Sequence, residues 1–298
     1  MNKSAVLWIL AFVTTLASAY YQRRTGPTYP IRGHAIISEK EISYQLLRSH
    51  GGGTDCPVQI ITGHPAISGI VEWKHHGTDE RYAQAPMTLT EGVLMAELPH
   101  QPPAGTLEYR VILKAGSDRL ILPEEEPAVV RFKGDTPAII LIPHIIAMFA
   151  AMLFSTRAGL EIFSPNPRLE TLTYCTIAFL VAGGMILGPI MQKYAFGAYW
   201  TGWPLGTDLT DNKTAVALLG WVAAAVALKR AKRPAIWAAI AALLLMTVYM
   251  IPHSVLGSEL KPGAGQPQPC AAMEIRHEGA TSSWRQIGQL QPLHRGRV

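Results

Sequence analysis

Charge is missing from four long stretches of this 298-residue chain. The segments 137–155, 172–191, 214–228 and 234–256 contain no Asp, Glu, Lys or Arg. Each is long enough, or nearly so, to cross the hydrocarbon core of a bilayer as a helix. A soluble protein of this length could not bury four helices that are apolar on every side. The absence of charge therefore predicts a four-helix transmembrane bundle over residues 137–256.

Cysteine and recognisable catalytic motifs are also scarce. The sequence has 3 cysteines, and it contains no His-x-x-x-His, Cys-x-x-Cys or His-Glu-x-x-His spacing. A phosphate-binding loop, a dinucleotide-binding fingerprint and a nucleophile elbow are absent too. These absences favour a protein that is not an enzyme, although they leave an unfamiliar activity open.

Basic residues gather in one short loop. Residues 229–233, between the last two apolar segments, are all Lys or Arg except one. Short loops of this kind remain on the cytoplasmic side of a membrane. Counting spans from this loop puts the segment before residue 137 and the tail after residue 256 outside. Arg23 and Arg24 oppose this assignment, but the larger cluster outweighs them. We therefore expect a multi-pass protein of the bacterial inner membrane, with a periplasmic β domain and a periplasmic C-terminal tail.

The first apolar run, residues 4–21, has two interpretations. A basic start, an apolar stretch and the triplet Ala17-Ser18-Ala19 follow the pattern of a cleaved signal peptide. The same run is also typical of a helix that is retained as an anchor. We favour a retained signal anchor over residues 1–21, because the apolar run continues past the cleavage site. Both interpretations put residue 22 outside.

Short apolar or alternating runs, separated by turn residues, fill residues 29–135. This spacing predicts a β-sandwich that resembles an immunoglobulin or fibronectin type III domain in size and strand count. The Cys–Trp–Cys pattern of true immunoglobulin domains is missing, since Cys56 is the only cysteine in this segment. The expected strands are 42–47, 58–62, 69–74, 87–90, 93–98, 107–113, 120–122 and 129–132. The core should include Val71, Trp73, Leu107, Tyr109 and Val111.

Charge and composition give no case for nucleic acid as a partner. The chain has a net charge of +5, but residues 22–135 hold slightly more Asp and Glu than Lys and Arg. The tail 257–298 is rich in Gly, Pro, Gln and Arg, and we expect it to be mostly disordered. Cys56 and Cys270 would share the oxidising side of the membrane, where a disulfide is permitted but not required.

Two Pro-His pairs indicate a candidate site near the outer membrane surface. At 1.5 Å per residue, His144 lies roughly 10 Å inside the first of the four spans, and His253 lies roughly 5 Å inside the last. These two helices run antiparallel, so we expect both imidazoles at similar depth, near the loop 208–213. Histidine within a span tends to face the interior of a bundle.

Three interpretations of this site remain open. In the first, the histidines donate to backbone carbonyls or to a neighbouring helix, Asp208 or Thr210 caps the next helix, and Asp211 is favourable near its N-terminus. In the second, His144 and His253 are the axial ligands of one b-type haem. In the third, they bind a divalent metal together with Asp208, Asp211 or Glu259.

The favoured role is a non-enzymatic, partner-binding or scaffold subunit of an envelope complex, acting through the β-sandwich. Its expected partners are membrane lipid and an envelope protein. The alternative is a membrane redox subunit that binds haem or a metal through His144 and His253. His75 and His76 are adjacent in one strand and face opposite sides, so we expect exposed side chains that do not share a metal.

Overall fold

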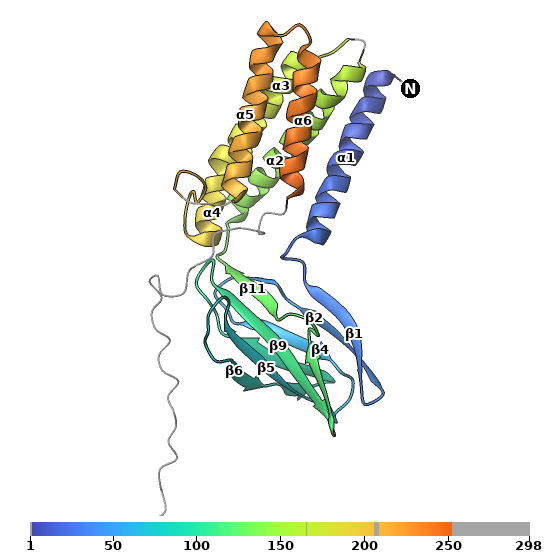
Figure 1. The fold of residues 1–298 in the computed structure, drawn as a ribbon, viewed down its shortest axis with the longest axis vertical. Coiled ribbons are helices and arrows are strands. Elements are labelled where there is room, and N and C mark those ends of the chain that lie inside the picture. Colours follow the sequence, from blue (N-terminus) through green and yellow to red (C-terminus); the bar gives the residue numbers. More distant parts are fainter. Residues whose placement is uncertain (1, 165, 206–208, 252–298) are drawn as a thin grey trace, which may run out of the picture. The chain divides into compact units, whose positions relative to one another are not determined.

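The computed structural model describes residues 2–164, 166–205 and 209–251. It is an α+β structure with two β-sheets and several long apolar helices (Figure 1). Helix α1 (Lys3–Thr25) precedes the strands. The strands are β1 (Ile31–Ile37), β2 (Lys40–Leu46), β3 (Ser49–Gly51), β4 (Cys56–Ile61), β5 (Ser68–His75), β6 (Ala83–Pro86), β7 (Thr88–Thr90), β8 (Val93–Leu98), β9 (Thr106–Ala115), β10 (Asp118–Leu122) and β11 (Ala128–Lys133). The later helices are α2 (Ala138–Gly159), η1 (Leu160–Phe163), α3 (Leu169–Phe179), η2 (Leu180–Leu187), α4 (Gly188–Phe196), α5 (Leu209–Arg230) and α6 (Pro234–Met250).

The strands form two sheets. One has five strands in the order β1-β2-β4-β8-β7, and the other has the order β3-β11-β9-β5-β6, with β10 also paired to β9. Neighbouring strands are antiparallel except for the short parallel pair β3 and β11. In β4, Val58 and Ile60 are buried whereas Gln59 and Ile61 are exposed. This alternation leaves one side of the sheet against the core and the other facing outward.

Residues from both sheets share one apolar core. Ile42 and Ile60 from the five-stranded sheet lie in the same buried cluster as Tyr109 and Phe132 from the other sheet. The Tyr109 hydroxyl donates to the Leu47 carbonyl at 2.8 Å, so its polar end is satisfied inside the core. The expected core residues that are buried are Val71, Leu107, Tyr109 and Val111, and Trp73 packs partly buried against them.

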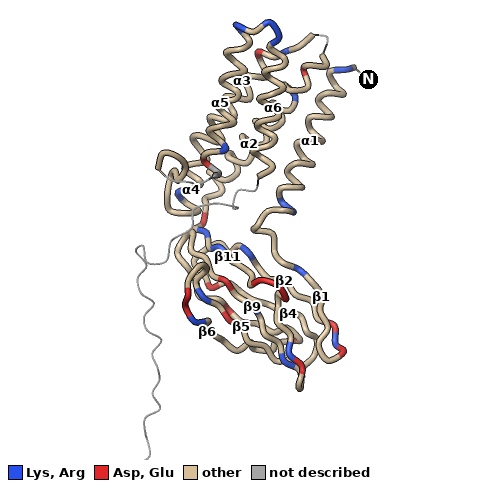
Figure 2. Tube along the Cα trace, viewed as in Figure 1, with Lys and Arg blue, Asp and Glu red and all other residues tan. Residues whose placement is uncertain are grey.

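Four helical segments are long and apolar enough to cross a membrane. They are Lys3–Thr25, Ala138–Phe163, Leu169–Phe196 and Asp211–Arg230. The last expected span is described as α6, whose 17 residues end at Met250. Alanines pack closely around the fully buried Trp221 of α5. Lys and Arg gather in the turn between α5 and α6 (Figure 2). These helices indicate a membrane protein.

Helix α1 packs against α2 through an aromatic contact that also covers a charge. The ring of Trp8 meets Phe154 edge-on, with centroids 5.8 Å apart. The guanidinium carbon of Arg157 lies 5.4 Å from the Trp8 ring centre. Arg157 is itself almost fully buried and forms an ion pair with Glu161. Trp8 is therefore part of the environment that holds a buried arginine.

Helix α1 also contacts α6. The Ser18 hydroxyl oxygen lies 3.2 Å from the Met246 sulfur, while its proton is donated to the Thr14 carbonyl of α1 at 2.7 Å. Gln22 Nε2 donates to the Tyr249 carbonyl at 3.0 Å. Ser18 belongs to the Ala-Ser-Ala triplet that resembles a cleavage site, and here it lies within a continuous helix. These contacts favour the interpretation of α1 as a retained helix.

We expect the purified protein to keep residues 1–19. Removing them would delete Trp8 and Ser18 and uncover the buried Arg157. Intact-mass measurement of the membrane-extracted protein tests this expectation directly. A mature chain that begins at Tyr20 would contradict it.

Candidate functional site

His144 lies in α2, directly after the proline inside that helix. Its Nδ1 is 2.9 Å from the carbonyl oxygen of Gly183, in the π-helical segment η2. A carbonyl can only accept, so Nδ1 carries the proton, and Nε2 of the neutral ring is left as an acceptor or ligand atom. Histidine ligands of metals are usually oriented by such a bond. The same bond also satisfies the ring without any ligand.

Glycines allow other helices to approach η2 closely. A Cβ on Gly183 would lie 2.9 Å from the Ala147 Cβ, and one on Gly184 would lie 2.5 Å from the Thr214 Cγ2. Both distances are shorter than real Cβ atoms show. A Cβ on Gly188, at the start of α4, would lie 3.9 Å from His144 Cε1. The segment therefore brings α2, α4 and α5 together beside His144, and π-helical segments often occur at functional sites.

Asp211, in the first turn of α5, organises the preceding loop. Its Oδ2 accepts the backbone N–H groups of Thr201 at 2.7 Å and Gly202 at 3.0 Å. It also accepts Gln192 Nε2, from α4, at 3.3 Å. The side chain is buried, and an acidic group near a helix N-terminus is favourable. Asp211 thus has a structural role in the described chain.

Lys213 lies buried near the same end of α5. Its Nζ donates to the Ile251 carbonyl, just beyond the end of α6, at 2.8 Å. With Met148, Thr214 and Tyr249 it lines a cavity of about 40 Å³. A cavity of this size can hold a water molecule or two, but it cannot hold a porphyrin.

The remaining expected ligands, Asp208, His253 and Glu259, lie outside the described residues. His144 and Asp211 both lie against α4, the first beside Gly188 and the second bonded to Gln192 one turn later. Within residues 2–164, 166–205 and 209–251, no three His, Cys, Asp or Glu side chains are grouped so that they could hold a metal. The haem and metal interpretations stay predictions.

Cys56 lies fully buried in β4, and its thiol is free. Burial raises the pKa of the Cys56 thiol to about 12. A thiol with so high a pKa is a poor nucleophile. Cys270, its expected partner, lies outside the described residues, so the disulfide stays untested.

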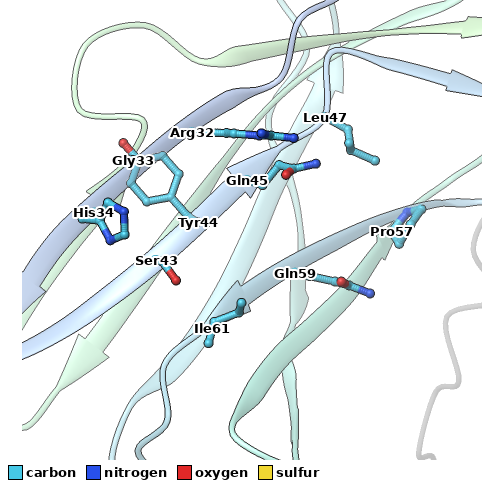
Figure 3. Close-up of a pocket in the computed structure, with 10 residues that line it drawn as sticks. All are labelled: Arg32, Gly33, His34, Ser43, Tyr44, Gln45, Leu47, Pro57, Gln59 and Ile61. Atoms are coloured by element: carbon cyan, nitrogen blue, oxygen red, sulfur yellow. The ribbon is translucent and has the colours of Figure 1, made fainter.

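A groove of about 520 Å³ lies on the five-stranded sheet (Figure 3). Two rows of paired residues cross it, Arg32–Gln45–Gln59 and His34–Ser43–Ile61. The lining residues are Arg32, Gly33, His34, Ser43, Tyr44, Gln45, Leu47, Pro57, Gln59 and Ile61. Figure 3 shows Tyr44 beside Gly33, where a Cβ would lie 2.5 Å from the Tyr44 hydroxyl. A larger residue at this position of β1 would require the end of the Tyr44 side chain to move.

Large apolar side chains are exposed on the outward side of the same sheet. Ile36 is 71% exposed, Ile61 58% and Met95 40%. Met95 pairs with Gln59, and Ile36 follows His34 by two residues, so all three share the side that carries the groove. Single exposed apolar residues are ordinary on protein surfaces. We call these three residues together with the groove the open sheet face.

A charged network covers the outward side of the other sheet. Glu108 accepts the Tyr82 hydroxyl at 2.6 Å, lies 3.0 Å from His76 Nδ1 and pairs with Lys74 at 3.3 Å. Burial and the Glu108 carboxylate together raise the pKa of Tyr82 to about 12. Burial pushes the pKa of Glu108 up, but bonds from Tyr82, His76 and Lys74 outweigh it, so the net pKa is lowered. The network is internally satisfied, as in a structural ion-pair cluster.

Neighbouring side chains extend this network. Glu72 accepts Arg110 Nε at 2.9 Å and Gln84 Nε2 at 2.9 Å. His75 Nδ1 lies 2.7 Å from Glu80, and this bond lowers the pKa of Glu80. His75 and His76 thus have different carboxylate partners, Glu80 and Glu108. Both are only partly exposed, because those partners cover them.

Replacing Glu108 with glutamine should remove an acid-sensitive part of the stability. Because the folded pKa of Glu108 is lowered, its contribution is complete above the ordinary value of 4.5 and is lost as the pH falls through the folded value. At pH 7 the variant should be less stable by about 1–3 kcal/mol. Thermal unfolding of the full protein between pH 3 and 7 should show this difference narrowing below about pH 4. Glu125→Gln, at an exposed position, should leave the profile unchanged, and a constant difference for Glu108→Gln would contradict the assignment.

No protein-family model matches the chain, and no curated protein matches it significantly. The functional conclusion therefore rests on the residues of this chain alone.

Proposed function

We propose that this chain is a non-enzymatic, partner-binding subunit of an envelope complex in a bacterial-type inner membrane. In this proposal residues 29–135 are a periplasmic β-sandwich of the immunoglobulin or fibronectin III type. Residues 137–256 form a four-helix transmembrane bundle, joined by α1 as a retained signal anchor. The partner is another envelope protein that docks on the open sheet face.

The observation that carries the proposal is the open sheet face itself. Ile36, Ile61 and Met95 are exposed beside a groove of about 520 Å³. The polar lining of this groove, such as Gln45 and Gln59, offers both donors and acceptors. Apolar anchors surrounded by hydrogen-bonding groups are typical of protein interfaces. The outward side of the other sheet, by contrast, has its charges mutually paired.

Orientation is tested by the access of single cysteines to a membrane-impermeant thiol reagent. The background is Cys270→Ser, which leaves buried Cys56 and the helical Cys175. In intact cells Asp79→Cys should label, since this residue is exposed just after the turn that follows β5, and Ala231→Cys should not. Labelling at Ala231 without labelling at Asp79 would overturn the periplasmic assignment.

Docking is tested with Ile61→Asp and Met95→Asp. Both positions are exposed, so a charged side chain there should not disturb folding. In the complex, however, the carboxylate would be buried away from water without a partner, which should weaken binding. The native complex extracted in mild detergent should lose its partner and become smaller by blue-native electrophoresis. Lys114→Asp, at an exposed position on β9, is the matched control and should leave the complex intact. An unchanged complex with both sheet-face variants would refute the proposal.

A redox subunit is the second candidate, and one observation favours it. The bond from His144 Nδ1 to the Gly183 carbonyl leaves Nε2 available as a ligand atom. His144 and His253 would hold a b-type haem, or a divalent metal with nearby carboxylates. The purified protein would then show a haem absorption band or a stoichiometric metal, either of which His144→Ala should abolish while His64→Ala should not. A colourless, metal-free protein would rule out the redox candidate, and partner binding would remain as the proposed function.

A further inference from the structure

Two arginines share one aromatic ring where α1 leads into β1. The guanidinium carbon of Arg24 lies 5.0 Å from the Tyr29 ring centre, and that of Arg32 lies 5.7 Å from it. Arg24 Nη1 also donates to the Tyr29 hydroxyl at 2.6 Å. Two positive charges of exposed residues therefore contact the same ring.

Arg23, the neighbour of Arg24, also acts on Lys133. Lys133 ends β11, shortly before α2 begins, and Arg23 precedes Arg24 in the last turn of α1. Burial lowers the pKa of Lys133, and the positive charges of Arg23 and Arg131 lower it further. Such a group is stabilised in its charged form if an anion is brought near. Figure 2 shows Lys and Arg at the end of α1 and in β11.

No carboxylate balances this cluster within the described part of the chain. The ion pairs found there involve other cations, and none includes Arg23, Arg24, Arg32 or Lys133. Arg23 and Arg24 are also the residues that oppose the positive-inside pattern of the sequence. These cations have no carboxylate partner among the described residues, and in the proposed topology Arg23 and Arg24 lie on the side of the membrane where positive charge is unusual. Both observations are explained if the cations bind an anion.

We infer that Arg23, Arg24, Arg32 and Lys133 bind the phosphate group of an anionic phospholipid at the membrane surface. Arg23 and Arg24 occupy the last turn of a helix that is long and apolar enough to span the bilayer, which puts them at headgroup level. The guanidinium fork matches phosphate oxygens and can donate two parallel bonds. Lipid phosphate is always present at this depth, unlike an acidic peptide.

The expected effect follows from the number of cations. One Lys or Arg near an anionic membrane surface changes affinity on the order of fivefold, so two should change it by at least about tenfold. Native mass spectrometry of the full protein in neutral detergent measures this effect. Phosphatidylglycerol and phosphatidylcholine are the two lipid probes, and their bound populations are compared.

The test variant is Arg23→Gln with Arg24→Gln, which leaves Arg32, itself a lining residue of the groove, and the rest of the open sheet face unchanged. In this variant the ratio of bound phosphatidylglycerol to bound phosphatidylcholine should fall by at least about tenfold. The matched control, Lys114→Gln with Arg119→Gln, removes the same charge from exposed positions of β9 and β10 and should retain the wild-type ratio. Arg23→Lys with Arg24→Lys should keep most of the preference for phosphatidylglycerol, which separates loss of charge from loss of folding.

Three outcomes would overturn the inference. The test variant could bind phosphatidylglycerol as the wild type does, or the control could lose as much binding as the test variant. Inorganic phosphate at millimolar concentration could also displace the lipid completely, which would identify a free-phosphate site. Because Arg23 and Arg24 lie outside the open sheet face, each of these results leaves the partner-binding proposal standing.

Discussion

Replacing Arg157 with methionine should destabilise the helical region by about 3–5 kcal/mol. Arg157 and Glu161 form an ion pair one helical turn apart, with side chains only 3% and 1% exposed. Glu161 also accepts the backbone N–H of Arg168 at 3.1 Å. Methionine has a similar length but no charge, so the Glu161 carboxylate would stay buried without its cation. Equilibrium unfolding of the full protein in detergent micelles measures the loss.

The companion variant isolates the charge from the packing. Arg157→Met combined with Glu161→Gln removes both charges, while the amide oxygen can still accept the N–H of Arg168. At least half of the lost stability should return, because no unpaired charge remains buried. Strictly additive losses in the double variant would show that the pair is not coupled as its geometry implies.

Replacing Asp211 with alanine should cost about 2–4 kcal/mol and loosen the loop that precedes α5. The change leaves the N–H groups of Thr201 and Gly202 without their acceptor, and the Gln192 amide keeps only its bond to the Thr201 hydroxyl at 2.6 Å. Each buried donor left without an acceptor costs about 1–3 kcal/mol, and water reaching the loop offsets part of the total. Hydrogen–deuterium exchange at residues 201–203 should rise together with the drop in the unfolding midpoint.

The neighbouring residue supplies the comparison. Asn212 Oδ1 accepts a single bond, from the N–H of Trp203 at 2.7 Å, and that bond is exposed to solvent. Asn212→Ala should therefore cost about 1 kcal/mol or less. If the two alanine variants were equally stable, the role of Asp211 as the organiser of this loop would be wrong.

Strands were predictable from sequence where apolar alternation was strong. The run 93–98 matches β8 at both ends, and the run 107–113 lies within β9. The β6 segment Ala-Gln-Ala-Pro has no β-branched or aromatic residue, and it pairs only because β5 offers a partner along its length. Likewise β1 contains Gly33, which weakens the local signal. Such strands are set by tertiary pairing and not by their own residues.

The candidate sites depended even more on register. The groove exists because Arg32, Gln45 and Gln59 lie in one row across three strands, and no local pattern specifies that row. One feature of the sequence did indicate this face. Buried and exposed residues alternate along β4, and after the buried Ile60 the exposed position is taken by another apolar residue, Ile61. Helical spans, by contrast, needed only length and absence of charge, so α2 and α5 were predictable with small errors at their ends.

The contacts of α1 with α6 also set the order in which the protein can be assembled. Ser18 and Met246 are separated by 228 residues, and Gln22 and Tyr249 by 227. At ~5–20 residues per second, a ribosome needs roughly 10–45 s to make the intervening chain. During that interval the Ser18 hydroxyl can bond to the Thr14 carbonyl of its own helix, but the Gln22 amide has no Tyr249 carbonyl to receive it. An insertase, a chaperone or water at the membrane surface must accommodate the Gln22 amide until synthesis reaches residue 250.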